Sequence, residues 1–181
     1  MKKRLIKTIA TFSFLLSLIG TTVYAANYRF NPERYASKNA YIQDIMDNTQ
    51  FHQYLSAACT YWTQSAANVS IWETYGSSYN QIRTNTTSSS TREGDTYPYT
   101  APDGSTAFFI DLYTSNILRN NTRNSSNYNE AAIVHEIGHI FGLADLNYLD
   151  THQAIMSYYN DRYVRYTPQP ADIEGVNKLY P

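Results

Sequence analysis

The chain has 181 residues, of which 43% are hydrophobic and 16% are charged, and its formal net charge is −1. That length suits one domain with a sizeable core, and the low charge fraction excludes a disordered acidic or basic chain. Eighteen residues are tyrosines, so the surface is expected to draw its polarity from hydroxyl and amide groups more than from ions.

The first 25 residues have the layout of a secretory signal peptide. Met1–Arg4 is basic, residues 9–20 are mostly apolar, and Val23-Tyr24-Ala25 predicts cleavage after Ala25. The apolar run is shorter than the roughly 20 residues of a membrane span. Removal of this segment leaves 10 basic and 15 acidic residues, a net charge of −5. A net negative charge does not favour binding to nucleic acid or to an anionic membrane. We therefore expect a secreted, extracellular protein.

Residues 26–39 are polar and lack a clear period, which suggests an N-terminal arm or a short pro-segment, and residues 40–181 are expected to form one domain. From residue 40 to about residue 67, apolar residues recur at helical spacing, and Asn48-Thr49 can cap a second helix within that stretch. The single cysteine, Cys59, lies in this pattern. Because the chain has only this one cysteine, it cannot form an intramolecular disulfide. The Cys59 thiol is expected to be buried and inert.

Strands are predicted at residues 69–75 and 79–84, where apolar and polar residues alternate. The next stretch, residues 85–103, is rich in Thr, Ser, Gly and Pro and predicts a long loop. A further strand is predicted at residues 106–113, a helix at residues 128–143, irregular structure at residues 148–167 and a final helix from Pro170. No repeat or linker divides the chain.

A metal-binding pattern stands in the helix predicted at residues 128–143. His135 and His139 are four residues apart, so on a helix both imidazoles project from one face and can hold one Zn²⁺. Glu136 lies about 100° further round, where its carboxylate can act on a water without binding the metal. The competing explanation is a surface helix with two unrelated histidines. The export signal and the continuation of the motif after His139 argue against it.

The third ligand is predicted from a turn. Gly142 follows His139 by three residues, and glycine tolerates the positive φ with which helices often end. The chain can then turn and present the carboxylate of Asp145 to the same metal. Two alternatives stay open: His152, if the intervening loop folds back, and Glu174, if a downstream helix supplies the ligand. The glycine turn favours Asp145 over Glu174.

The resulting motif, H-E-x-x-H-x-x-G-x-x-D, resembles the elongated motif of the metzincin metalloproteases, which most often has histidine at the last position. Aspartate at that position is shared with the small secreted neutral proteases of the snapalysin type, to which this sequence is similar. The resemblance implies a single α+β domain. Its parts are a small twisted, mostly parallel sheet with an antiparallel edge strand, a long backing helix, an active-site helix and a C-terminal helix. Residues 106–113 would be the edge strand that pairs with an extended substrate.

Two downstream residues extend the resemblance. Met156 resembles the methionine of the tight turn beneath the metzincin zinc site, although a methionine among apolar residues is also common core filler. Tyr158 resembles the tyrosine that astacin-like and serralysin-like enzymes hold near the metal, where its phenol could donate to an oxyanion. With 18 tyrosines in the chain, coincidence is the rival explanation.

The function that the resemblance implies is a zinc endopeptidase. His135, His139 and Asp145 would hold Zn²⁺, and Glu136 would be the general base. The substrate would be a protein or peptide, the protein would be a monomer, and no motif supports a calcium site. The alternative is an inactive, zinc-containing secreted module that binds polymers or proteins, which the abundant tyrosines motivate and the intact Glu136 opposes. Hydrolysis of a non-protein amide also stays open.

Overall fold

The computed structural model describes residues 28–85, 91–147 and 153–181. The expected signal peptide, residues 1–25, and His152 lie outside the described residues. The helices and strands are, in chain order, β1 (Arg29–Phe30), β2 (Asn39–Asp44), the 3₁₀ turn η1 (Thr49–Phe51), α1 (His52–Gln64), β3 (Ser70–Thr74), β4 (Gln81–Asn85), β5 (Gly94–Thr100), β6 (Thr106–Tyr113), α2 (Thr114–Asn120), α3 (Ser126–Ile140), β7 (Leu143–Ala144) and α4 (Pro170–Leu179).

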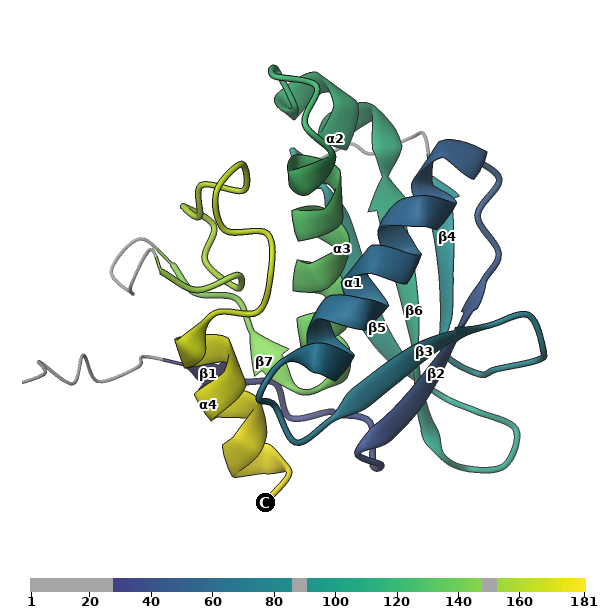
Figure 1. Ribbon diagram of the computed structural model, residues 1–181. Helices are drawn as coiled ribbons and strands as arrows, with labels where there is room; N and C mark the ends of the chain where they lie inside the picture. The colour runs from purple at the N-terminus through teal and green to yellow at the C-terminus, as the bar shows by residue number, and fades with distance from the viewer. Residues whose placement is uncertain (1–27, 86–90, 148–152) are drawn as a thin grey trace, which may run out of the picture.

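A five-stranded sheet in the order β3-β2-β4-β6-β5 forms one layer of the domain. Its first four strands are parallel to their neighbours, and β5 runs antiparallel to β6 at the edge. Helices α1 and α3 lie together over one face of this sheet (Figure 1). The predicted fold class, a single small α+β domain with a mostly parallel sheet and an antiparallel edge, is confirmed.

The antiparallel strand at the edge of the sheet is β5, and the prediction that residues 106–113 form that edge strand was wrong. Strand β6 lies between β4 and β5, with Phe109 opposite Gln81 on one side and Tyr97 on the other. Most of β6 is buried, as expected for an interior strand of a sheet that carries helices on one face.

Strand β5 lies within the stretch that composition predicts to be a loop. Pro98 stands in the middle of it, opposite Phe108 of β6. Proline cannot donate a ladder hydrogen bond, but an edge strand needs such bonds on one side only and so tolerates it. The Thr, Gly and Pro content of this stretch is therefore compatible with an edge strand as well as with a loop.

The helix predicted from residue 40 is also wrong in its first part. Ala40 and Ile42 are buried and alternate with more exposed neighbours along β2, which is a strand pattern. The Asp44 carboxylate accepts the Met46 amide proton at 2.8 Å just after the strand ends. The helical structure begins later, where the side chain of Asn48 accepts the Gln50 amide proton, so the predicted cap is correct.

The core between α1, α3 and the sheet is centred on Trp62. This side chain is fully buried, and its indole Nε1–H donates to the Val134 carbonyl at 2.9 Å, which joins α1 to α3. Cys59 is buried as predicted, and burial raises the pKa of its thiol to about 12, so the thiol stays protonated. Among the described residues, no helix is long and apolar enough to cross a membrane.

Candidate metal centre

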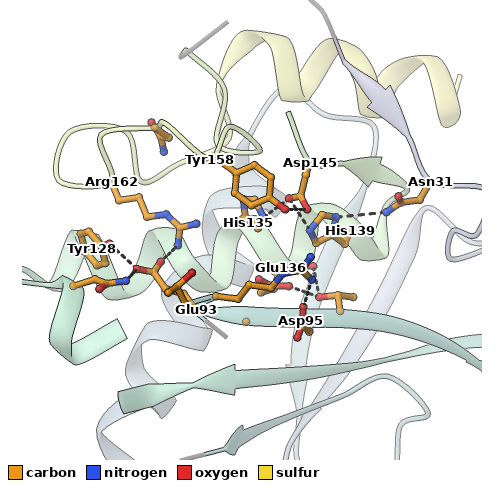
Figure 2. Close-up of a pocket in the computed structure, with 16 residues that line it drawn as sticks. Asn31, Glu93, Asp95, Tyr128, His135, Glu136, His139, Asp145, Tyr158 and Arg162 are labelled. Carbon is orange, nitrogen blue, oxygen red and sulfur yellow. Dashed lines mark hydrogen bonds and ion pairs between the residues drawn. The ribbon is translucent and has the colours of Figure 1, made fainter. Parts of the chain in front are cut away.

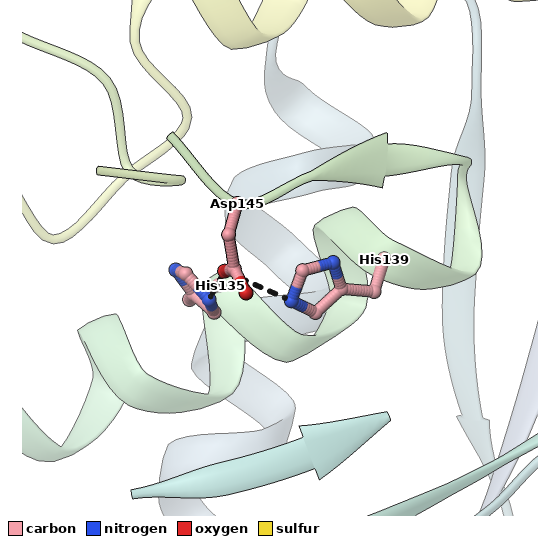
Figure 3. A group of neighbouring side chains, drawn as sticks. All are labelled: His135, His139 and Asp145. Carbon is pink, nitrogen blue, oxygen red and sulfur yellow. Dashed lines mark ion pairs between the residues drawn. The ribbon is translucent and has the colours of Figure 1, made fainter. Parts of the chain in front are cut away.

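Helix α3 carries the two histidines, and the chain turns back directly after it. Gly142 has a φ of +86° and its amide donates to the His139 carbonyl at 3.0 Å, so the helix ends at the predicted glycine. The two residues of β7 follow, and Asp145 comes next. This turn brings the chain back alongside α3, with Asp145 next to His135 and His139 (Figure 3).

His135, His139 and Asp145 converge on one point. Asp145 Oδ1 lies 2.9 Å from His135 Nε2 and 3.4 Å from His139 Nε2 (Figure 3). One ligand atom from each residue lies within 4.8 Å of the others, which is compact enough for a single metal ion. The structure thus brings together the three residues that the spacing predicted.

The hydrogen bonds of the two rings fit a cation at this point. His135 Nδ1 lies 2.9 Å from the Ile155 carbonyl, and His139 Nδ1 lies 2.7 Å from the Leu143 carbonyl. A carbonyl oxygen can only accept, so Nδ1 of each ring carries the proton, and in the neutral rings each Nε2 presents a lone pair. Asp145 Oδ1 is buried and has no hydrogen-bond donor. Three electron-pair donors therefore face one another, as ligands of Zn²⁺ do.

The charges of His139 and Asp145 shift each other's pKa. Burial lowers the pKa of His139, but Asp145 and the Glu136 charge outweigh that effect and raise this pKa to about 9. Burial alone would raise the pKa of Asp145, whereas the two histidines hold it well below its usual range. The cluster thus favours a negative carboxylate beside positive charge, which a divalent cation would provide.

Tyr158 and the N-terminal arm support the third ligand. The Tyr158 phenol donates to Asp145 Oδ2 at 2.6 Å, and burial, together with the Asp145 carboxylate, raises the pKa of Tyr158 to about 12. Its hydroxyl is therefore protonated at neutral pH. In the arm, β1 pairs with β7, and the Asn31 amide donates to the Leu143 carbonyl at 3.0 Å. Both contacts fix the segment that carries Asp145.

Met156 packs against α3 at Gly138. It is buried, and a side chain at Gly138 would come within 2.5 Å of its sulfur atom. The turn that contains Met156 also supplies the Ile155 carbonyl that orients His135. The sequence predicts this methionine in a tight turn beneath the zinc site, and the structure has it in a turn that packs against the helix of the two histidines.

Asp172, at the start of α4, holds that turn in place. Its buried carboxylate accepts the amide protons of Ile155 and Gln169 at 2.8 Å each, and that of Met156 at 3.4 Å. Burial raises the pKa of Asp172 to about 6 although these donors oppose the shift. The sequence did not predict this role, and its only signal is the acidic residue in the first turn after Pro170.

Replacement of Asp172 by alanine should lower the free energy of unfolding by about 2–5 kcal/mol, because three backbone amides, two of them buried, would lose their acceptor. Urea unfolding of the metal-free protein, followed by tryptophan fluorescence, measures this change. Asp172→Asn keeps one carbonyl oxygen as an acceptor and should cost less. An alanine variant as stable as the parent would contradict the assigned role.

Glu136, one residue after His135 on α3, points toward β5 in the same pocket as the three ligands (Figure 2). The pocket has a volume of about 380 Å³. Thr96 of β5 donates its hydroxyl proton to Glu136 Oε2 at 2.7 Å. The predicted general base therefore lies beside the ligand cluster and against the edge strand.

The far wall of the pocket is built around Glu93. This carboxylate pairs with Arg162 and accepts hydrogen bonds from Tyr128 at 2.6 Å and from Asn120 at 2.8 Å (Figure 2). The sequence did not predict these residues, because Glu93 and Arg162 lie in stretches without a regular period. They make the wall polar and nearly neutral in charge.

Glu174, the alternative ligand on α4, is not in the cluster. Its carboxylate lies 3.4 Å from the Tyr28 hydroxyl and 3.5 Å from Lys178 Nζ. The structure therefore supports Asp145 over Glu174 as the third member of the group.

In comparisons with known proteins, no protein-family model matches this chain and no curated protein matches it either.

Proposed function

We propose that this chain is a secreted zinc endopeptidase of the metzincin type. The observation that carries the proposal is the convergence of two Nε2 atoms and a donorless carboxylate oxygen in a pocket that also contains Glu136. A purely structural site would have no need of a carboxylate that lines the pocket without joining the ligands. The motif from His135 to Asp145 and the turn at Met156 add the family resemblance.

The ligands proposed for Zn²⁺ are His135 Nε2, His139 Nε2 and Asp145. When bound there, Zn²⁺ would supply Lewis acidity for the attacking water and the scissile carbonyl. The chain's own part is to hold the ligands: the Ile155 and Leu143 carbonyls fix the two rings, and Tyr158 fixes the carboxylate.

Glu136 is the proposed general base. One of its carboxylate oxygens accepts a proton from the attacking water and then delivers that proton to the leaving amine nitrogen. Tyr158 is protonated and half exposed, with 52% of its surface accessible. Its hydroxyl can leave Asp145 and donate to the oxyanion that develops on the substrate carbonyl.

Strand β5 is the proposed docking edge for the substrate, in place of residues 106–113. Within the described residues, β5 pairs only with β6, so its other edge offers backbone groups to an extended peptide. Thr96 of the same strand contacts Glu136, so a peptide added to this edge would pass beside the general base.

Removal of zinc tests the proposal. The purified protein should contain one zinc ion per chain and cleave an unfolded protein such as casein. Treatment with a chelator should abolish cleavage, and added Zn²⁺ should restore it. Stoichiometric zinc without cleavage of any unfolded protein or peptide library would overturn the proposal and favour a zinc-containing binding module.

A further inference from the structure

We infer that Gly94 and Thr96 of β5 form a cradle that sets the position of the Glu136 carboxylate, and that both are positioning residues for catalysis. The inference rests on the proposed function, because it assigns how the general base of that reaction is held. Neither residue belongs to the motif on α3; both come from the edge strand and line the pocket.

Thr96 fixes one oxygen of the carboxylate. Its Oγ1 lies 2.7 Å from Glu136 Oε2 and 3.1 Å from the Glu136 backbone carbonyl. A hydroxyl carries one proton, so the shorter contact to the charged oxygen takes it. This hydrogen bond occupies Oε2 and leaves Oε1 as the oxygen that can accept a proton from water.

Gly94 provides the space for that second oxygen. A Cβ atom at residue 94 would lie 2.6 Å from Glu136 Oε1, 2.7 Å from Cδ and 2.8 Å from Cγ. All three are side-chain atoms of Glu136, which can rotate away. A side chain at residue 94 would therefore displace the carboxylate while leaving the backbone of β5 where it is.

The position of this carboxylate matters because proton transfer requires hydrogen-bond reach. A misplacement of about 1 Å can cost about 100-fold in rate. A glutamate side chain has several rotatable bonds, and the hydrogen bond from Thr96 restricts their rotation. The cradle thus restricts Glu136 from the strand that we propose to bind the substrate.

Substitutions at Thr96 test the hydrogen bond. Thr96→Val should lower kcat on a peptide substrate about 10-fold to 100-fold and leave KM within about twofold, since the lost bond is to a charged group that acts in the chemical step. Thr96→Ser keeps the hydroxyl and should retain most of the activity. Thr60→Val is the control, because Thr60 is exposed on α1 and its hydroxyl donates to the Ser56 carbonyl, away from the pocket. Equal kcat for Thr96→Val and the parent would overturn the assignment.

Substitution of Gly94 tests whether the Glu136 carboxylate needs the space that the missing side chain at residue 94 leaves. Gly94→Ala should lower kcat by about 10-fold or more, with zinc content and thermal stability close to those of the parent. Gly76→Ala is the control, because the nearest atom to a Cβ there is 3.5 Å away. An active Gly94→Ala variant would show that the carboxylate does not need this space.

A measurement on the metal-free protein separates this inference from the proposed function. The chain has six glutamates, so ¹³C labelling of their carboxyl carbons gives six signals, and Glu136→Gln identifies the one from Glu136. Thr96→Val and Gly94→Ala should shift that signal, whereas Thr96→Ser and Thr60→Val should not. An unshifted signal overturns the cradle. A shifted signal in a protein that never cleaves peptides would support the cradle and overturn the peptidase proposal.

Discussion

Replacement of Glu136 by glutamine should lower the rate of peptide hydrolysis by about 100- to 10,000-fold while one zinc ion per chain stays bound. Glutamine has the same shape as glutamate, and its amide can still accept the Thr96 hydroxyl proton through its carbonyl oxygen. It cannot take a proton from water. Since Glu136 is not among the converging ligand atoms, zinc content should be unchanged.

The measurement combines initial rates on a fluorogenic peptide with zinc analysis of the same sample. Glu130→Gln is a matched control, because Glu130 lies on the same helix and its carboxylate accepts a hydrogen bond from Tyr61 at 2.7 Å, away from the ligands. That variant should keep its activity. Full activity of Glu136→Gln would end the proposal that this residue is the general base.

Replacement of Asp145 by alanine should remove zinc from the protein at ordinary zinc concentrations, and activity should be lost with it. The affinity should fall by more than the roughly 10- to 100-fold that loss of an outer-shell partner costs, because a ligand itself is removed. The two histidines would remain, oriented by the Ile155 and Leu143 carbonyls, so the fold around them should persist.

Competition with a chromophoric chelator measures this affinity. Glu174→Gln and His152→Ala are the matched comparisons, since each removes one of the alternative ligands that the sequence left open. Both should bind zinc as the parent does. If either of them loses zinc while Asp145→Ala retains it, the assignment of the third ligand is wrong.

The ligand helix and its turn could be predicted because the relevant contacts are local. His135 and His139 lie one turn apart on α3, and Gly142 ends the helix with a positive φ. Spacing along the chain therefore determines most of their relative geometry. The same turn brings Asp145 toward the histidines, although Tyr158 and the pairing of β1 with β7 then hold it in place.

The strands were harder to predict because their partners are distant in sequence. Strand β2 has apolar residues whose short spacing fits a helix or a strand, and only its pairing with β3 and β4 decides between them. Strand β5 has the composition of a loop, and its pairing with β6 makes it a strand. Propensity is a weak guide where tertiary pairing determines the structure.

The parts of the site that sequence reasoning missed also depend on long-range contacts. Thr96 reaches Glu136 from β5, and Asp172 reaches the turn at Ile155 from α4. Nothing in the local pattern around Thr96 or Asp172 indicates these partners. The motif predicts which residues carry the chemistry, whereas the residues that hold them in place emerge only once the chain is folded.

The pairing of β1 with β7 has a consequence for the order in which the molecule is assembled. The segment that carries Asp145 is secured by residues 29–31, near the beginning of the domain, and the turn that orients His135 is secured by Asp172, near its end. A nascent chain that has not yet emerged as far as α4 lacks that last support. The proposed metal centre should therefore be complete only once β1 and α4 have both docked against the rest of the domain.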